Sequence, residues 1–270
     1  MPFVDANGVR TYFEETGKGP PLLLIAGNGM DHTTFRDQIP EFARHFRCIT
    51  YDLRGIGQSD VPPDGYTTRD MAADAMSLLS ELDIPAAHVA GYSLGGAIAQ
   101  EMALASPERV RTLSLYSSYS HVMPYLRLRY ELLIKILNAG APDIWAMFTA
   151  FSAFGEAYIN EHEPELRQEI AGREARWRGP DAPSKVGLLG HYQAILSHDA
   201  LKRLDRIRCP TLIAVGSSDP VTPPVYANLM HDLIHGSTLR IYPGAPHRLL
   251  NFTAEFTADA LSFLLTNRDR

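Results

Sequence analysis

The sequence predicts an α/β protein built around one hydrophobic core. Short apolar runs of strand length alternate with longer segments in which apolar residues recur every three or four positions, as they do in helices. Apolar residues make up 45% of the 270 positions, so the chain can bury one large core. No internal repeat or low-complexity tract interrupts this alternation. We therefore expect a single α/β core.

The expected elements follow in order along the chain. Asn7-Gly8 is a hairpin turn signal between strands at 3–6 and 9–15. Further strands are expected at 21–26, 47–51, 89–91, 110–116, 211–215 and 238–242. Helices are expected within 28–45, from Thr67 to Leu82, over 95–105 and at the C-terminal end. Pro85 cannot continue the second of these helices, so it marks its end.

An abrupt change from strand to helix around Ser93 indicates a nucleophilic serine. Gly91-Tyr92-Ser93-Leu94-Gly95 directly follows an apolar run and directly precedes the helical pattern. Such a turn forces its central residue into strained backbone dihedrals, and the flanking glycines let neighbouring backbone approach closely. The hydroxyl then stands at the end of a sheet, beside a helix N-terminus that favours a developing anion. This context predicts a nucleophile elbow.

An acid and a histidine follow two later strands. A serine is a weak nucleophile at neutral pH unless a base takes its proton and a third group orients that base. Asp219 lies in the loop after the strand at 211–215, and His247 lies in the turn after the strand at 238–242. The carboxyl ends of parallel strands meet at one edge of a sheet, which is where open α/β sheets build their sites. We therefore expect Ser93, Asp219 and His247 to form a catalytic triad.

On these residues the chain resembles the α/β-hydrolases over essentially its whole length. The order Ser93, Asp219, His247 is the one expected of that family, and residues 52–60 and 208–211 are similar to its loop after strand four and its approach to strand seven. The resemblance implies an α/β-hydrolase fold, with a mostly parallel eight-stranded sheet, helices on both faces and a helical cap inserted after strand six. Within the family the chain is most similar to small bacterial hydrolases that include 3-oxoadipate enol-lactonases and aminoacrylate hydrolase.

The family can also place its acid after strand six, but residues 117–120 contain none. Asp199 and Asp205 precede the strand at 211–215 and so lie at the other end of the sheet. Asp52 and Asp60 follow a strand, in a loop that reads as structural. Asp219 is therefore the expected acid.

The connection from residue 117 to residue 210 is long enough to hold the cap. A crossover between parallel strands needs only a dozen or more residues. The surplus contains helical patterns at 125–137, 143–154 and 164–177, followed by a break rich in Pro and Gly at 179–187. We expect the cap at 119–197, and the hydrolase core at 1–118 and 198–270.

The resemblance also implies an oxyanion hole made of two backbone N–H groups. These map onto Leu94, which follows the nucleophile, and Asn28, in the loop after strand three. Ala26-Gly27 stands where the family has His-Gly, which leaves Gly29 as an alternative donor.

Candidates for the substrate pocket are Gly29, His121, Trp145 and Phe148. His121 begins the cap and serves either the pocket or the hinge. The cap is rich in large apolar side chains that either line the pocket or pack the cap onto the core, namely Trp145, Met147, Phe148, Phe151, Phe154 and Trp177. Arg173, Arg176 and Arg178 form either a site for a substrate carboxylate or, as we expect, a solvated helix face.

Composition narrows the classes of partner. The net charge of −6 argues against nucleic acid, and neither a signal peptide nor an apolar run of membrane-spanning length is visible. Cys48 and Cys209 read as small core residues, and no metal-binding or dinucleotide-binding motif occurs. We expect a cytoplasmic monomer or homodimer that acts on a small molecule without a cofactor or metal.

These features predict a serine hydrolase that cleaves a carboxylic ester or lactone through an acyl-enzyme on Ser93. The same triad could instead cleave a carbon–carbon bond or transfer an acyl group, and the fold also serves non-catalytic ligand receptors. Dehalogenases and epoxide hydrolases are disfavoured, because those relatives carry an aspartate at the position of Ser93.

Overall fold

The structure is a computed structural model, and it describes residues 2–180 and 182–270. Residue 1, part of the N-terminus read for a signal peptide, and residue 181, inside the expected break, lie outside the described residues. The described strands are β1 (Phe3–Ala6), β2 (Val9–Thr16), β3 (Pro21–Ile25), β4 (Arg47–Tyr51), β5 (Ala87–Tyr92), β6 (Val110–Tyr116), β7 (Thr211–Gly216) and β8 (Thr238–Tyr242). They form one sheet in the order β1-β2-β4-β3-β5-β6-β7-β8. The pairs β1–β2 and β2–β4 are antiparallel and the remaining pairs are parallel, which confirms the mostly parallel sheet.

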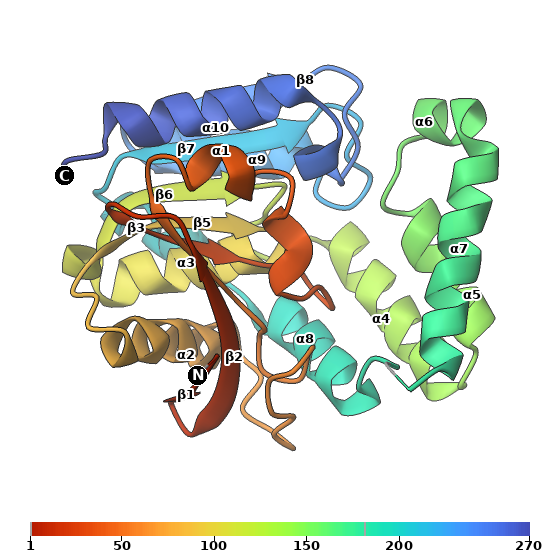
Figure 1. The fold of residues 1–270 in the computed structure, drawn as a ribbon. Helices are drawn as coiled ribbons and strands as arrows, with labels where there is room; N and C mark the ends of the chain where they lie inside the picture. Colours follow the sequence, from red (N-terminus) through yellow and green to blue (C-terminus); the bar gives the residue numbers. More distant parts are fainter. Residues whose placement is uncertain (1, 181) are drawn as a thin grey trace.

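Helices cover both faces of this sheet (Figure 1). The core helices are α1 (Ile39–Phe42), α2 (Thr68–Glu81), α3 (Leu94–Ala105), α9 (Pro224–Leu233) and α10 (Ala254–Thr266). Short 3₁₀ helices are η1 (His32–Phe35), η2 (Pro107–Arg109), η3 (Leu201–Arg206) and η4 (Leu249–Asn251). The loop and helix expected within 28–45 are observed as a loop that contains η1, followed by α1. Pro40 lies in the first turn of α1, which is the position that proline fits.

The two faces of the sheet belong to two hydrophobic clusters. Alternate residues of a strand point to opposite faces, so Leu23 and Ile25 join the cluster that contains α2, α3 and α9. Leu22 and Leu24 join the cluster that contains α1 and α10. A strand such as β3 is therefore apolar throughout, as expected of a strand covered on both sides.

In the described part of the connection from β6 to η3, five helices lie beyond the carboxyl ends of the parallel strands (Figure 1). They are α4 (Pro124–Asn138), α5 (Pro142–Phe151), α6 (Glu156–Glu161), α7 (Glu163–Arg178) and α8 (Lys185–Ser197). Helices α4 and α8 contribute to the same hydrophobic cluster as α2 and α3. Ala150, Phe154 and Leu166, in and beside α5 and α7, form a small separate cluster. The inserted helices thus divide into an inner pair on the core and an outer group.

Helix α8 is the main element that the sequence pattern missed. The expected break at 179–187 contains its first turn, which Ser184 caps by accepting the N–H of Gly187 at 3.1 Å. A Cβ atom on Gly187 would lie 1.9 Å from the carbonyl oxygen of Gly55, and one on Gly190 would lie 2.3 Å from the ring of Tyr66. These glycines therefore serve the close approach of two backbones and do not interrupt the helix.

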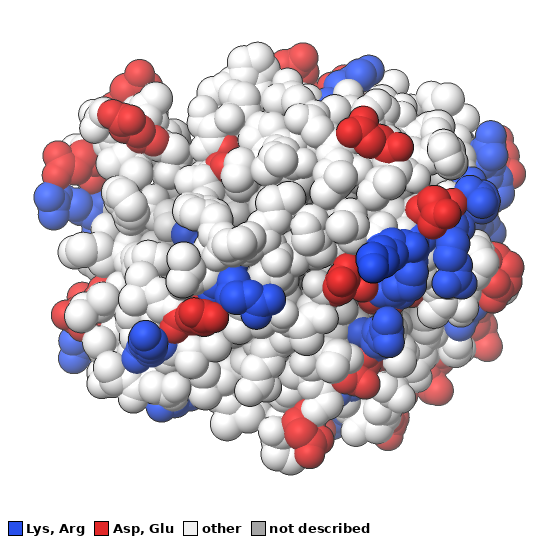
Figure 2. Space-filling model, turned by 180° about the vertical axis from the view of Figure 1, so that it is seen from behind, with Lys and Arg blue, Asp and Glu red and all other residues white. Residues whose placement is uncertain are grey.

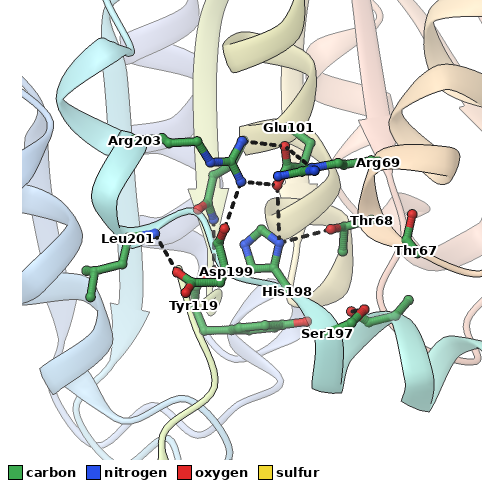
Figure 3. A network of polar contacts seen from close by, with 12 residues as sticks. Thr67, Thr68, Arg69, Glu101, Tyr119, Ser197, His198, Asp199, Leu201 and Arg203 are labelled. Atoms are coloured by element: carbon green, nitrogen blue, oxygen red, sulfur yellow. Dashed lines mark hydrogen bonds and ion pairs between the residues drawn. The ribbon is translucent and has the colours of Figure 1, made fainter.

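A buried polar network joins the end of the insertion to the core (Figure 3). His198, which follows α8, lies 3.0 Å from the hydroxyl of Thr68 and 3.8 Å from the carboxylate of Glu101. Glu101 on α3 accepts two hydrogen bonds from Arg203 at 2.6 and 2.8 Å. Burial lowers the pKa of His198 to about 4, and the carboxylate of Glu101 only partly opposes this effect. The histidine is therefore neutral at pH 7.

The rear face of the molecule carries both signs of charge. Figure 2 shows basic and acidic side chains next to one another around an area with few charged groups. None of the helices formed by residues 2–180 and 182–270 has the length and apolar character needed to cross a membrane.

Candidate active site

Ser93 stands at the junction of β5 and α3, in a backbone conformation that few residues adopt. Its φ is +54° and its ψ is −114°, and its N–H donates to the carbonyl of Tyr116 at 2.8 Å. A Cβ on Gly91 would lie 2.2 Å from the carbonyl oxygen of Gly95, and a Cβ on Gly95 would lie 2.2 Å from that of Ile25. Only glycine fits on either side of this turn, which holds the serine at the carboxyl edge of the sheet.

The structure brings Ser93, His247 and Asp219 together. Nε2 of His247 lies 3.2 Å from Oγ of Ser93, and Nδ1 lies 2.8 Å and 3.0 Å from the two carboxylate oxygens of Asp219. All three residues are at least nine-tenths buried, with exposed fractions of 4%, 8% and 3% for Ser93, His247 and Asp219. This is the chain of contacts in which a histidine can take the serine proton while a carboxylate fixes its ring.

Asp219 is held by its own loop. One carboxylate oxygen accepts the backbone N–H groups of Val221 and Thr222, each at 2.8 Å. The hydroxyl of Thr222 donates to the other oxygen at 3.0 Å. These three donors fix the carboxylate opposite His247, and Thr222 is a positioning residue that the sequence pattern did not single out.

The loop after β3 places Asn28 and Gly29 in the lining of the cavity that Ser93 also borders. The Gly29 N–H donates to Nδ1 of His191 at 3.3 Å, while Nε2 of His191 lies 2.9 Å from the carbonyl oxygen of Arg54. Because a carbonyl only accepts, Nε2 carries the proton and Nδ1 is the acceptor. Burial lowers the pKa of His191 to about 4, which keeps this tautomer neutral. Within the described chain, the N–H groups of Asn28 and Leu94 have no such partner.

Ser93 and His247 open into a cavity of about 530 Å³ between the core and the inserted helices. Asn28, Gly29 and Trp145 are among the residues that line it. Trp145 is fixed by a hydrogen bond from its indole N–H to the hydroxyl of Tyr192 at 2.9 Å. The cavity is of the size that small-molecule sites usually have.

Two residues expected in the pocket lie outside its lining. The backbone of His121 pairs with Asp199 where the insertion leaves and rejoins the core, and its ring lies against Tyr226. Phe148 is half-buried among apolar neighbours and lies under the guanidinium of Arg129. The central carbon of that guanidinium is 5.1 Å from the centroid of the Phe148 ring. His121 thus occupies the hinge position, and Phe148 packs the inserted helices.

Of the three arginines expected on a solvated face of α7, Arg173 is the one that the structure corrects. Arg173 is half-buried in the cavity wall, and Arg176 also lines the cavity but is exposed. Arg178 is exposed and donates to Glu174 at 2.8 Å. One oxygen of Glu169 accepts both Arg173 at 2.6 Å and Arg248 at 2.8 Å. Charged residues occur on every side of α7, so its sequence gave no signal of which side faces the cavity.

The described residues form neither a metal-binding cluster nor a reactive thiol. No group of three His, Cys, Asp or Glu side chains within 2–180 and 182–270 is arranged to hold a metal ion. Cys48 and Cys209 are free thiols, and burial raises the pKa of Cys48 to about 12 and that of Cys209 to about 11. Both therefore stay protonated at neutral pH.

Comparison with known proteins places the chain among hydrolases. Residues 20–250 match the model of the alpha/beta hydrolase fold family. The RutD protein of Azorhizobium caulinodans, a proposed carbamate hydrolase, is 32% identical over 232 residues, which cover 85% of either protein. A hydrolase of known structure from Pseudomonas aeruginosa PA01 is 30% identical with a TM-score of 0.86, covering 97% of both chains.

The fold is also that of an enol-lactonase from Burkholderia xenovorans LB400, at 22% identity and a TM-score of 0.85, covering 98% of this chain and all of the other. The family match and the named relatives support a hydrolytic activity. The resemblance seen in the sequence is confirmed, and the chain belongs to the α/β-hydrolase fold family.

Proposed function

We propose that the protein is a serine hydrolase that cleaves a carboxylic ester or lactone through an acyl-enzyme on Ser93. The observation that carries this proposal is the continuous contact from Asp219 through His247 to Ser93 at the wall of the cavity. A buried serine in a strained turn, with a histidine at hydrogen-bond distance, has the features of an activated nucleophile.

The first step forms the acyl-enzyme. Nε2 of His247 takes the proton of the Ser93 hydroxyl as Oγ attacks the carbonyl carbon of the substrate. The tetrahedral intermediate collapses, the carbon–oxygen bond breaks, and His247 gives its proton to the leaving alkoxide. In a lactone that alkoxide stays attached to the acyl group. Asp219 stabilises the imidazolium throughout and keeps its own charge.

Water completes the reaction. His247 takes a proton from a water molecule as its oxygen attacks the acyl-enzyme carbonyl, and the proton returns to Ser93 when the acid leaves. In both steps the negative oxygen is stabilised by N–H groups placed where the charge develops. We assign these donors to Leu94 and Asn28. Gly29, the alternative donor, is already bonded to His191.

Carbamates are a second candidate class of substrate. The support comes from the relatives proposed to hydrolyse carbamate, of which the Azorhizobium protein covers most of this chain. The steps are the same for a carbamate ester or amide, since Ser93 would attack the carbonyl and His247 would protonate the departing oxygen or nitrogen.

The test combines covalent labelling with turnover. A fluorophosphonate probe should label Ser93 in the native protein and leave Ser93→Ala unlabelled, while Ser262→Ala, an exposed serine on α10, reacts like the wild type. A parallel panel of ethyl esters, lactones and carbamates identifies the bond that is cleaved. Labelling at another serine, or a folded protein that reacts with neither probe nor panel, would refute the triad.

A further inference from the structure

Arg129 is an arginine in the cavity wall with no carboxylate partner among the described residues. It lies on α4, and its Nη2 donates to the hydroxyl of Ser152 at 2.5 Å. Its Nε is buried and has no hydrogen-bond partner in the described chain. A buried N–H of a charged group without a partner is costly, because it has lost its hydration and gained no acceptor.

The other arginines of the cavity differ in this respect. Arg173 and Arg248 share an oxygen of Glu169, and Arg176 lies 3.7 Å from the carboxylate of Asp31. Arg36 lies 3.7 Å from the carboxylate of its neighbour Asp37. Among the described residues that line the cavity are five arginines and two acids, so this part of its wall carries an excess of positive charge. Such a wall attracts anions into the cavity.

Two observations place the Arg129 guanidinium close to the triad. First, Ser152, which accepts a hydrogen bond from Arg129, is followed in the chain by Ala153. The carbonyl of Ala153 accepts the N–H of Arg248 at 3.4 Å, and Arg248 directly follows His247. Burial raises the pKa of Tyr130, and the charges of Arg129 and Asp219 act on this side chain in opposite directions. Tyr130 itself lines the cavity, so arginine and triad face the same space.

The guanidinium is also held in place before any ligand arrives. Ser152 fixes one nitrogen, and the ring of Phe148 lies beneath the plane at 5.1 Å. Guanidinium groups present parallel N–H donors that match the two oxygens of a carboxylate, and a fixed guanidinium loses little entropy on binding.

We propose that Arg129 is a specificity residue that binds a carboxylate of the substrate, so that the preferred substrates are esters or lactones carrying a second, free carboxylate. This inference rests on the proposed function for the bond that is cleaved. The carboxylate supplies the acceptor that Nε lacks in the described chain, and it leaves the scissile carbonyl to Ser93.

The test compares matched esters. Monoethyl glutarate carries one free carboxylate and diethyl glutarate carries none, and the release of ethanol measures both. The wild type should prefer the monoester by about tenfold or more in kcat/KM, and Arg129→Gln should remove most of that preference. Arg129→Lys keeps the positive charge but loses the pair of parallel N–H donors. It should therefore retain only part of the preference that Arg129→Gln loses.

Arg127→Gln is the matched control, because Arg127 lies on the same helix, is exposed and is not part of the cavity lining. Equal turnover of the two esters by the wild type would overturn the inference. So would an Arg129→Gln variant in which both esters lose activity to the same degree.

Binding of the free dicarboxylate separates this inference from the proposed function. Glutarate should bind to Ser93→Ala, measured by calorimetry, and should bind about tenfold or more weakly when Arg129→Gln is added. If neither ester is cleaved but glutarate binds in an Arg129-dependent way, the proposed reaction fails and the carboxylate site stands. If the esters are cleaved and the affinity for glutarate is the same with and without Arg129→Gln, the proposed reaction stands and the carboxylate site fails.

Discussion

The backbone N–H of Gly29 donates to Nδ1 of His191 at 3.3 Å, which ties the loop after β3 to helix α8. The same ring reaches the carbonyl of Arg54 with its other nitrogen. One neutral, fully buried imidazole thus links three segments that are far apart in the sequence, and it fixes the loop whose Asn28 lines the same cavity as Ser93.

Replacing His191 by leucine should weaken both stability and turnover. The substitution leaves the Gly29 N–H and the Arg54 carbonyl without partners, so unfolding should become easier by about 2–4 kcal/mol. Turnover should fall about tenfold, because Asn28 loses its fixed position. Melting temperature and kcat measure the two effects. His191→Gln, which keeps a donor and an acceptor, should lose less, and a leucine variant as stable as the wild type would contradict the role of this contact.

Asp219→Asn should keep the fold and remove most of the activity. The amide would accept the N–H groups of Val221 and Thr222 but would present a donor to His247, which favours the wrong tautomer. A loss of about 10⁴-fold in kcat is expected, as for the equivalent change in the serine-protease triad. Asp205→Asn, an exposed acid before β7, is the control. A loss below about tenfold would show that another group orients His247.

Trp145 and Phe148 should respond differently to truncation. Trp145 lines the cavity, so Trp145→Ala should raise KM or change the preference for acyl-chain length in a series of neutral esters. Phe148 lies outside the lining, so Phe148→Ala should lower the melting temperature and leave the chain-length preference as it was. The same chain-length shift in both variants would contradict this division.

Gly187 and Gly172 form a pair of helical glycines with opposite expectations. A Cβ at position 187 would lie 1.9 Å from the Gly55 carbonyl, so Gly187→Ala must push α8 away from the core and destabilise the protein by about 1–3 kcal/mol. A Cβ at position 172 meets nothing within 4 Å, so Gly172→Ala should stabilise α7 by about 0.5–1 kcal/mol. Urea unfolding of the two variants tests both signs.

Acidification should destabilise the protein partly through His198. The folded pKa of His198 is about 4, below the ordinary value of 6.5 that applies to the unfolded chain. Between these values the unfolded state binds a proton that the folded state does not, so stability is lost as pH falls from about 6.5 to 4.

His198 alone should account for about 2 kcal/mol between pH 7 and pH 5. His198→Gln removes that contribution, so its free energy of unfolding should depend less on pH over this range. Urea unfolding at the two pH values gives the comparison. An unchanged pH dependence in the variant would show that folding does not lower the pKa of His198.

The sequence predicted the core best where local pattern and tertiary packing agree. The strands β4 and β6 begin and end where the pattern puts them, because an apolar run in a covered sheet is also a run of strand length. The same agreement holds at Ser93, since an elbow must combine a strand, small residues and a helix within one short stretch. Ser93, Asp219 and His247 could therefore be named before their contacts were known.

Prediction from the sequence failed where a residue's role depends on contacts with residues that are distant in the chain. Gly187 looks like a helix breaker until Gly55 is placed against it. Arg173 carries no sign of the cavity, because the neighbours that decide its direction are Glu169 and Arg248, which come together only in the folded chain. Arg129 stands out only because none of the described carboxylates pairs with it.

The positive φ of Ser93 sets stability against chemistry at a single position. A non-glycine residue held at φ +54° and ψ −114° adds strain to the folded state, on the order of 1–3 kcal/mol. Glycine would relieve that strain but would supply no hydroxyl. A chain optimised for thermal endurance alone would therefore carry glycine at position 93, and this protein holds its serine there against its own conformational preference.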